Sequence, residues 1–407
     1  MSSIDFRWCA GIEDTFIISP NSVTGKTLDE YELTGHYQNW EKDLSNIASL
    51  GLKWLRWGIP WYRVNPKKGI FDWSWLDDVF NFFHSNQLSP IVDFVHYGTP
   101  TWLEGSFVNP DYPEYVAEYI ERVFERYGSI IKAATPCNEP FTAAEWSSKI
   151  DDWPPAIPGD TGFVAVMIGI VKGVAKASKI FKSYGVESIH VEVAGGTIPL
   201  APDVAELAKF ENARQLLYWD LLSGKVNEFH ILFPWLLQNG VTEKIIREIS
   251  EAQACIDVIG INYYPQWSYK KYSYSANGTL NVQNYLGGTN ELLELMRFMS
   301  SRYERPLMIT ETSWMGSQEE KATWLKQSIK ATGKARADGI EVIGYTWFPV
   351  IEMVDWRYRF TPGSIDDFRL DLGLWNIERK ENCAAKLYRD IIRKFGGKGP
   401  TNEEFAL

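Results

Sequence analysis

The 407-residue sequence predicts an α/β fold, a single (β/α)8 or TIM barrel, on two observations. Short apolar runs alternate along the chain with longer stretches in which apolar residues recur every three or four positions. In addition, no linker, low-complexity run or short-period repeat interrupts this alternation. Strands joined by helices form parallel sheets, so we expect residues 1–407 to form one barrel domain. The pattern alone leaves a doubly wound open sheet as an alternative.

The candidate strands are short apolar runs, and all but the fifth have polar groups at or just beyond their ends. They cover residues 6–12, 53–59, 90–96, 132–138, 188–195, 257–264, 306–311 and 341–348. The clearest helical patterns lie between them or after the last of them. They cover residues 37–51, 75–87, 112–128, 321–339 and 383–396.

Composition and charge exclude several classes of partner. The formal net charge is −11, which argues against binding to nucleic acid. The four cysteines lie far apart and form neither zinc spacing nor a disulfide framework. No apolar run approaches the roughly 20 residues of a membrane span. The N-terminus resembles no signal peptide, so we expect a cytoplasmic protein.

Aromatic residues are unusually frequent, at 14% of the chain. About half of them belong to an ordinary core by our interpretation. The others stand beside charged or amide residues, as in "PWYR", "NYYPQW" and "VDWRYRF". Aromatic faces next to hydrogen-bonding groups suit the flat faces and hydroxyl rims of sugars, so a carbohydrate or glycoside is the expected ligand.

In such a barrel, the functional residues lie at the C-terminal ends of the strands. One histidine among them is too few for a metal site, and no glycine-rich phosphate loop is present, so we predict neither a metal nor a cofactor. The polar and aromatic candidates at these ends are Glu13, Arg56, His96, Asn138, Glu139, Tyr264, Glu311, Trp347, Phe348, Glu352, Asp355 and Trp356.

Two carboxylates stand out among these candidates. Glu139 follows the fourth strand and Glu311 ends the seventh, so they approach a bound molecule from opposite sides of the barrel. Glycoside hydrolysis uses such a pair, with retention of configuration at a separation of about 5–5.5 Å and inversion at roughly 6.5–9.5 Å. Taken singly, either glutamate could be a solvated strand end.

The ordered motifs of the chain resemble glycoside hydrolase family 1, within the larger clan of retaining barrel glycosidases with glutamates on strands four and seven. The resemblance covers almost the whole chain. The matching stretches are "HYQNWEKDLSNIASLGLKWLRWGIPWYRVNP", "FVHYGTPTWL", "CNEP", "DVIGINYY", "ITET", "GYTWFPVIEMVDWRYRF" and "DLGLWNIERKENCAAKLYRDII".

The resemblance implies a role for each matching residue. Glu139 would be the general acid/base and Glu311 the nucleophile. Asn138 would hold the sugar 2-hydroxyl, and Tyr264 would donate a hydrogen bond to Glu311. Arg56 would lie beneath Glu311 and keep it ionised, because a positive charge lowers the pKa of a carboxyl group.

The resemblance also implies a sugar-binding shell. His96 would bind a sugar hydroxyl, and Trp347 or Phe348 would form an apolar floor. Asp355 and Trp356 would contact the outer hydroxyls.

Departures from the family pattern fall on this shell. Glu13 stands nearest to the usual glutamine after the first strand, and the family's His-Trp-Asp run reads His96-Tyr97-Gly98. The shorter Asp355 replaces a glutamate. We therefore expect a divergent branch of the family, and the sequence leaves open which sugar it prefers.

The sequence as a whole predicts a β-glycosidase that retains configuration by double displacement. Two alternative functions remain: a transglycosylase that uses the same two glutamates, and a sugar-binding barrel that lacks catalytic activity. A barrel aldolase is a weaker alternative, because no lysine ends a strand to form a Schiff base.

Overall fold

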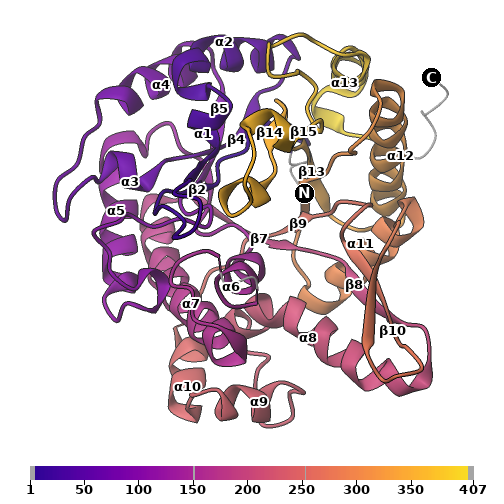
Figure 1. The fold of residues 1–407 in the computed structure, drawn as a ribbon. Coiled ribbons are helices and arrows are strands. Elements are labelled where there is room, and N and C mark those ends of the chain that lie inside the picture. Colours follow the sequence, from indigo (N-terminus) through magenta and orange to yellow (C-terminus); the bar gives the residue numbers. More distant parts are fainter. Residues whose placement is uncertain (1–4, 150–151, 253, 402–407) are drawn as a thin grey trace.

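The computed structural model describes residues 5–149, 152–252 and 254–401. Its centre is a closed barrel of eight parallel strands, in the order β1-β13-β12-β9-β7-β6-β5-β4 (Figure 1). The barrel strands are β1 (Arg7–Gly11), β4 (Trp54–Gly58), β5 (Ser89–Asp93), β6 (Ala133–Thr135), β7 (Glu187–Val193), β9 (Val258–Asn262), β12 (Leu307–Glu311) and β13 (Val342–Trp347). The predicted fold class and all eight predicted strands are confirmed.

Helices surround the barrel and connect its strands (Figure 1). They are α1 (Glu30–Leu33), α2 (His36–Ser49), α3 (Trp61–Val64), α4 (Ser74–Ser85), α5 (Tyr112–Tyr127), α6 (Pro140–Ser148), α7 (Gly159–Tyr184), α8 (Ala205–Leu222), α9 (Phe233–Gln238), α10 (Glu243–Glu251), α11 (Thr289–Tyr303), α12 (Gln318–Ala337) and α13 (Cys383–Phe395). The five predicted helical patterns correspond to α2, α4, α5, α12 and α13. No helix within the described ranges is long and apolar enough to cross a bilayer.

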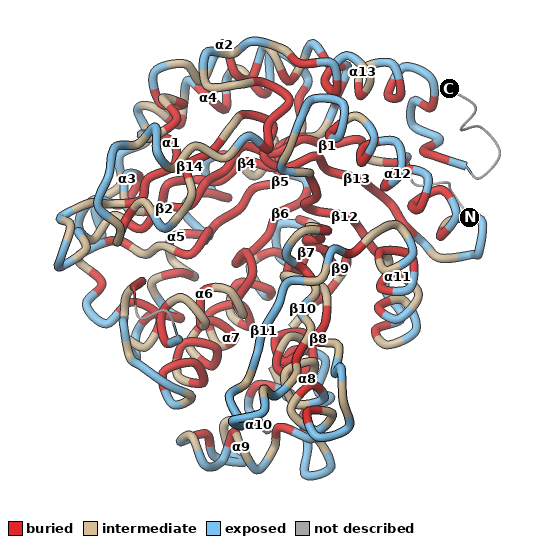
Figure 2. Tube along the Cα trace, turned by 45° about the vertical axis from the view of Figure 1, so that its right-hand side comes forward, coloured by how far each residue is buried: buried red, intermediate tan, exposed pale blue. Residues whose placement is uncertain are grey.

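The core has two parts, and both follow from the barrel geometry. Side chains that point inward fill the barrel itself, and a larger cluster lies between the strands and the helices. Figure 2 shows the buried strands enclosed by helices whose outer faces are exposed. The inward-pointing residues are Cys9, Ile91, Ala133, Ile189, Val191, Val258, Met308 and Ile343.

Short strands outside the barrel shape the loops around it. The sequence analysis did not predict them. The strands are β2 (Phe16–Ile17) with β3 (Leu28–Asp29), β14 (Met353–Val354) with β15 (Arg369–Leu370), and β8 (Gly196–Pro199) with β10 (Tyr269–Tyr274) and β11 (Leu280–Tyr285).

Candidate active site

Glu139 lies between β6 and α6 in an unusual backbone conformation. Pro136 lacks an N–H group, and β6 ends just before it, at Thr135. The chain then turns, and Glu139 adopts a φ of 37° before Pro140 begins α6. A left-handed conformation is costly for a residue with a side chain and persists only where surrounding contacts impose it. Such residues cluster at functional sites.

Glu192, from β7, holds the start of α6 in place. Its Oε2 accepts the N–H of Phe141 at 2.7 Å, and its Oε1 accepts the N–H of Val193 at 2.8 Å. Its side chain is fully buried, and burial together with the charge of Glu139 raises its pKa well above the ordinary value. Glu192 therefore fixes the backbone directly after Glu139.

The Glu139 carboxyl group accepts three hydrogen bonds. Tyr97 donates its hydroxyl to Oε2 at 2.6 Å, and Thr142 donates to the same oxygen at 2.8 Å. Asn262, the last residue of β9, donates Nδ2 to Oε1 at 2.8 Å. Asn262 is in turn oriented by Thr310, whose hydroxyl donates to its Oδ1 at 2.7 Å. The carboxyl group is thus held in one orientation.

Glu311 ends β12, three places from β6 around the ring of eight strands. Arg56 of β4 donates Nη1 to its Oε1 and also forms an ion pair with it. Tyr264 donates its hydroxyl to Oε2 at 2.6 Å. Both carboxyl oxygens are therefore engaged, as a nucleophile with a fixed direction of attack requires.

Asn138 links the two glutamates. Its Oδ1 accepts Nη2 of Arg56 at 2.6 Å and Nδ2 of Asn262 at 3.2 Å, while its Nδ2 donates to the hydroxyl of Tyr97 at 2.9 Å. Arg56 also binds Glu311, and Tyr97 also binds Glu139. A single hydrogen-bonded residue therefore separates each carboxyl group from the Asn138 amide.

A buried network of ion pairs lies next to this cluster. Arg56 Nη2 lies 2.7 Å from Asp93 Oδ2, and His96 Nδ1 lies 2.7 Å from Asp14 Oδ1. Oxygen and nitrogen atoms of Asp14, Asp93 and His96 come within 4.8 Å of one another, close enough to hold a metal ion. The Arg56 guanidinium already supplies a positive charge there, and His96 Nδ1 faces Asp14. The set therefore suits an ion-pair network better than a cation site.

The electrostatics of the cluster follow from burial and from these charges. The pKa of Glu311 is raised to about 8, with burial as the largest cause. The charge of Glu139 also raises this pKa, whereas the charges of Arg56 and His96 and the hydrogen bond from Tyr264 lower it. This direction differs from the expectation that Arg56 keeps Glu311 ionised, because the loss of water outweighs the guanidinium charge. Burial opposes a charge on His96, but Asp14 raises its pKa well above the usual value.

Of the two candidates for an apolar floor, Phe348 lies in the cluster. Its ring is parallel to that of His96, with centroids 6.1 Å apart, and Arg56 Cζ lies 5.3 Å from its centre. Gly11 makes room for it, since a Cβ there would come within 2.2 Å of the ring. Trp347 points away, because successive strand residues alternate in direction, and its Nε1 donates to Leu372 O at 3.1 Å.

The remaining candidates divide between the cluster and its surroundings. Glu13 is buried after β1 and accepts the hydroxyl of Thr15. Trp356 lies over Tyr97, with ring centroids 5.2 Å apart. Asp355 is engaged by Arg357.

Glu352, a predicted substrate contact, has its carboxyl group engaged by the segment that precedes α13. Its Oε2 accepts the N–H of Ile377 at 3.0 Å. Burial, together with the neighbouring carboxyl group of Asp371, raises its pKa. The fold of the loop after β13, which the sequence pattern did not reveal, turns this side chain toward the C-terminal segment.

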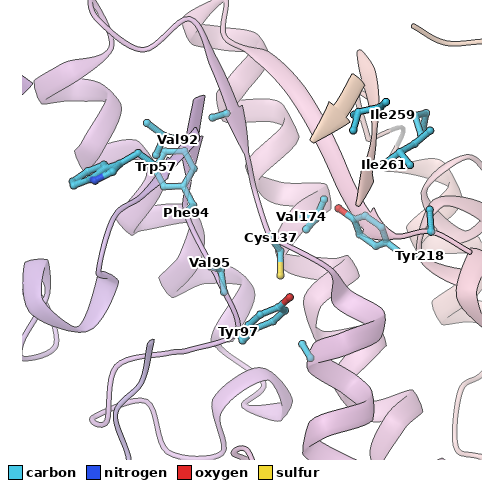
Figure 3. Packing of buried hydrophobic residues seen from close by; sticks show 14 of the residues in the cluster. Trp57, Val92, Phe94, Val95, Tyr97, Cys137, Val174, Tyr218, Ile259 and Ile261 are labelled. Carbon is cyan, nitrogen blue, oxygen red and sulfur yellow. The ribbon is translucent and has the colours of Figure 1, made fainter. Parts of the chain in front are cut away.

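The sequence analysis missed several residues of the cluster: Tyr97, Thr142, Asn262, Glu192, Asp14 and Asp93. Tyr97 was noted only as a departure from a family motif. Figure 3 shows it with Val95 and Cys137 among the buried side chains of the core. The position of Asn262 at a strand end was the available signal, since strand ends carry the functional groups of a barrel.

A parallel barrel with one buried glutamate after β6 and another at the end of β12, both linked to the Asn138 amide, has the parts that glycoside hydrolysis requires. Fold and site together therefore point to the class of barrel glycosidases.

The chain belongs to glycosyl hydrolase family 1, whose family model matches residues 9–396. Among curated relatives, aryl-phospho-beta-D-glucosidase BglC of Bacillus subtilis is 22% identical, over 94% of this chain and 91% of its own length. Beta-glucosidase A of Acetivibrio thermocellus is 21% identical, over 95% of this chain and 92% of its own length.

Solved structures show the same fold. The beta-glucosidase of Thermotoga maritima, in complex with castanospermine, superposes with a TM-score of 0.83. The two sequences are 18% identical, and the match covers 96% of this chain and 98% of the other. At this identity the likeness establishes the barrel fold alone.

Proposed function

We propose that this protein is a retaining β-glycosidase, with Glu311 as the nucleophile and Glu139 as the general acid/base. The observation that carries the proposal is the link between the two carboxyl groups through Asn138. A retaining pair lies about 5–5.5 Å apart and an inverting pair roughly 6.5–9.5 Å apart. We infer the retaining arrangement because the chain belongs to glycosyl hydrolase family 1, which its motifs resemble as a family of retaining enzymes.

In the first step, the ionised Glu311 attacks the anomeric carbon as the glycosidic bond breaks. Glu139 gives its proton to the departing oxygen, and a covalent glycosyl-enzyme intermediate forms. Glu311 must lose its own proton before it attacks. Arg56, His96 and Tyr264 ease this loss, because each lowers the pKa of Glu311.

In the second step, Glu139 acts as a base. Its carboxylate takes a proton from a water molecule, whose oxygen attacks the anomeric carbon and releases Glu311. The hydrogen bonds from Tyr97, Thr142 and Asn262 hold Glu139 in one place through both steps. Asn138 Nδ2 is the group proposed to contact the sugar 2-hydroxyl, a contact that strengthens in the transition state.

The stereochemistry of the product tests the proposal. The names of the relatives make aryl β-glucosides the first substrates to try. Proton NMR of the reaction should show the β-anomer of the sugar first, with the α-anomer appearing only by mutarotation. Initial release of the α-anomer would refute retention. Substantial turnover by Glu311→Gln would refute the assignment of the nucleophile.

A further inference from the structure

The Tyr97 hydroxyl binds the amide nitrogen that the sugar 2-hydroxyl is proposed to contact. It accepts Nδ2 of Asn138 at 2.9 Å while it donates to Glu139 Oε2 at 2.6 Å. In the proposed reaction, the same Asn138 Nδ2 donates to the 2-hydroxyl of the glycone. A phenol of the protein and a hydroxyl of the substrate are therefore directed at one nitrogen atom.

Hydrogen-bond partners fix the orientation of the Asn138 amide. Its other side faces two donors, Nη2 of Arg56 at 2.6 Å and Nδ2 of Asn262 at 3.2 Å. The amide oxygen must lie on that side, because a rotated amide would bring its own N–H groups against these donors. Nδ2 therefore lies on the side of Tyr97.

Both hydrogens of Asn138 Nδ2 point at groups of the protein. One is directed at the Tyr97 hydroxyl, and the other at Nε2 of His96, 2.9 Å away. The His96 ring is held in turn by Asp14, whose Oδ1 lies 2.7 Å from Nδ1. An amide nitrogen has two hydrogens and no more, and Asn138 is fully buried. A sugar hydroxyl that binds Nδ2 must therefore displace one of these two partners.

Tyr97 is held in place by its surroundings. Its side chain is 2% exposed, and its ring packs against those of Trp153 and Trp356, with centroids 4.8 Å and 5.2 Å away. The next residue, Gly98, lies so close to β2 that a Cβ there would come within 1.8 Å of Phe16 O. Both the ring and the backbone of Tyr97 are thus fixed, so its hydroxyl stays beside the amide when a substrate binds.

The sequence places a hydrogen-bond acceptor where the family pattern has none. The family's His-Trp-Asp run reads His96-Tyr97-Gly98 in this chain. An indole N–H group only donates, whereas a phenol hydroxyl both donates and accepts. A tyrosine at this position can therefore take a hydrogen from Asn138, which a tryptophan could not do.

We propose that Tyr97 competes with the sugar 2-hydroxyl for Asn138, so that the site accepts β-glycosides whose glycone lacks a hydroxyl group at position 2. The proposal rests on the proposed function and names a substrate class for it. A 2-hydroxyl gains a hydrogen bond from Nδ2 and breaks the one to Tyr97, so the exchange contributes little to binding of the transition state. A 2-deoxy glycone leaves the bond between Tyr97 and Asn138 intact.

A matched pair of substrates tests the competition. The experiment compares kcat/KM for 4-nitrophenyl β-glucoside and for 4-nitrophenyl 2-deoxy-β-glucoside. The wild-type protein should prefer the glucoside by no more than about 10-fold, because one hydrogen bond is exchanged for another. A larger preference would indicate an uncontested contact to the 2-hydroxyl, which strengthens in the transition state, and would overturn the proposal.

Two variants assign the effect to the bond between Tyr97 and Asn138. Tyr97→Phe removes the competing acceptor, so the preference for the glucoside over its 2-deoxy analogue should rise by about 5- to 10-fold. Thr142→Val is the matched control, because Thr142 donates to the same oxygen of Glu139 at 2.8 Å, whereas Asn138 donates to Tyr97. The control should lower kcat/KM for both substrates and leave the preference unchanged.

The difference in intrinsic reactivity between the two substrates cancels when the preference of a variant is divided by that of the wild-type protein. No rise in a folded Tyr97→Phe protein would overturn the competition. An equal rise in Thr142→Val would also overturn it, because the effect would then act through Glu139. Turnover of the glucoside with either result would leave the proposed function standing.

Binding separates this proposal from the proposed function in the opposite case. If neither aryl substrate is hydrolysed, calorimetry with glucose and with 2-deoxyglucose, on the wild-type and the Tyr97→Phe protein, still tests the competition. A stronger preference for glucose in Tyr97→Phe would support the competition and count against hydrolysis. An equal preference in the two proteins, or binding of neither sugar, would overturn the competition.

Discussion

Tyr97 and Glu139 are joined by a hydrogen bond of 2.6 Å, from the phenol hydroxyl to Oε2 of the carboxyl group. The same phenol oxygen accepts Nδ2 of Asn138 at 2.9 Å. Tyr97 thus connects the proposed acid/base to the amide that also receives Arg56. Its backbone has a φ of 68°, a second left-handed residue within the cluster.

Removal of this hydroxyl should impair the acid/base without unfolding the protein. Tyr97→Phe is expected to lower kcat/KM by about 5- to 10-fold, the value of one buried hydrogen bond. The loss should grow for aryl glycosides with poorer leaving groups, which depend more on protonation. Tyr274→Phe, at an exposed position of β10, is the matched control. Equal losses across all leaving groups would argue against a link to Glu139.

The pH dependence of kcat/KM should follow the ionisation of Glu311. Its pKa is raised to about 8, and the protonated form cannot attack. The kcat/KM of the free enzyme should therefore rise with pH until that value is approached. Tyr264 lowers this pKa, so Tyr264→Phe should move the rise to still higher pH. A pH profile with its lower limb near the ordinary carboxyl range would contradict the structure.

Loss of the acid/base should leave a site that accepts small anions. Glu139→Ala is expected to lower kcat by about 10²–10⁴-fold, the usual share of general acid–base catalysis. Azide should restore turnover of an activated aryl glycoside and yield a β-glycosyl azide, because it needs no deprotonation. Glu104→Ala, at an exposed carboxylate in the loop after β5, is the control. A lack of rescue, or an α-azide product, would count against the assigned role.

Glu192 should act through the backbone that it holds. Glu192→Leu leaves the N–H groups of Phe141 and Val193 without acceptors, which costs about 1–3 kcal/mol for each buried group. We expect a lower melting temperature together with a lower kcat, and a smaller effect for Glu192→Gln, which keeps one acceptor. Unchanged kcat in a folded Glu192→Leu protein would limit Glu192 to a structural role.

Much of the fold could be predicted because it is encoded locally. Each barrel strand is a short apolar run, and its boundaries differ from the expected ones by a few residues. The predicted strand at 132–138 ends early, at Thr135, because Pro136 cannot donate to the ladder. The small sheets outside the barrel were not predicted. Four of their strands, β2, β3, β14 and β15, are two residues long and too short for a periodic pattern, and β8 pairs with β10 far along the chain.

Site residues could be predicted where a polar residue type at a strand end was enough to mark them. They could not be predicted where the role of a residue depends on the direction in which its side chain points. Glu139, Glu311, Arg56, Asn138 and Tyr264 are brought together by the structure. By contrast, the choice between Trp347 and Phe348 depended on which of two neighbouring residues points inward.

Contacts across loops were also beyond the sequence pattern. Glu352 is drawn to the Ile377 N–H by the fold of the segment after β13. Glu192 holds the start of α6 through the N–H of Phe141, which belongs to another element.

Glu311 should form a covalent bond to the anomeric carbon of the sugar during the reaction. Incubation with 2-deoxy-2-fluoro-β-glucosyl fluoride slows the second step, so the intermediate should accumulate. Intact-mass spectrometry should then show one added fluorosugar, and peptide mapping should place it on Glu311. An adduct on another residue, or no adduct from a protein that hydrolyses the parent β-glucoside, would contradict the account.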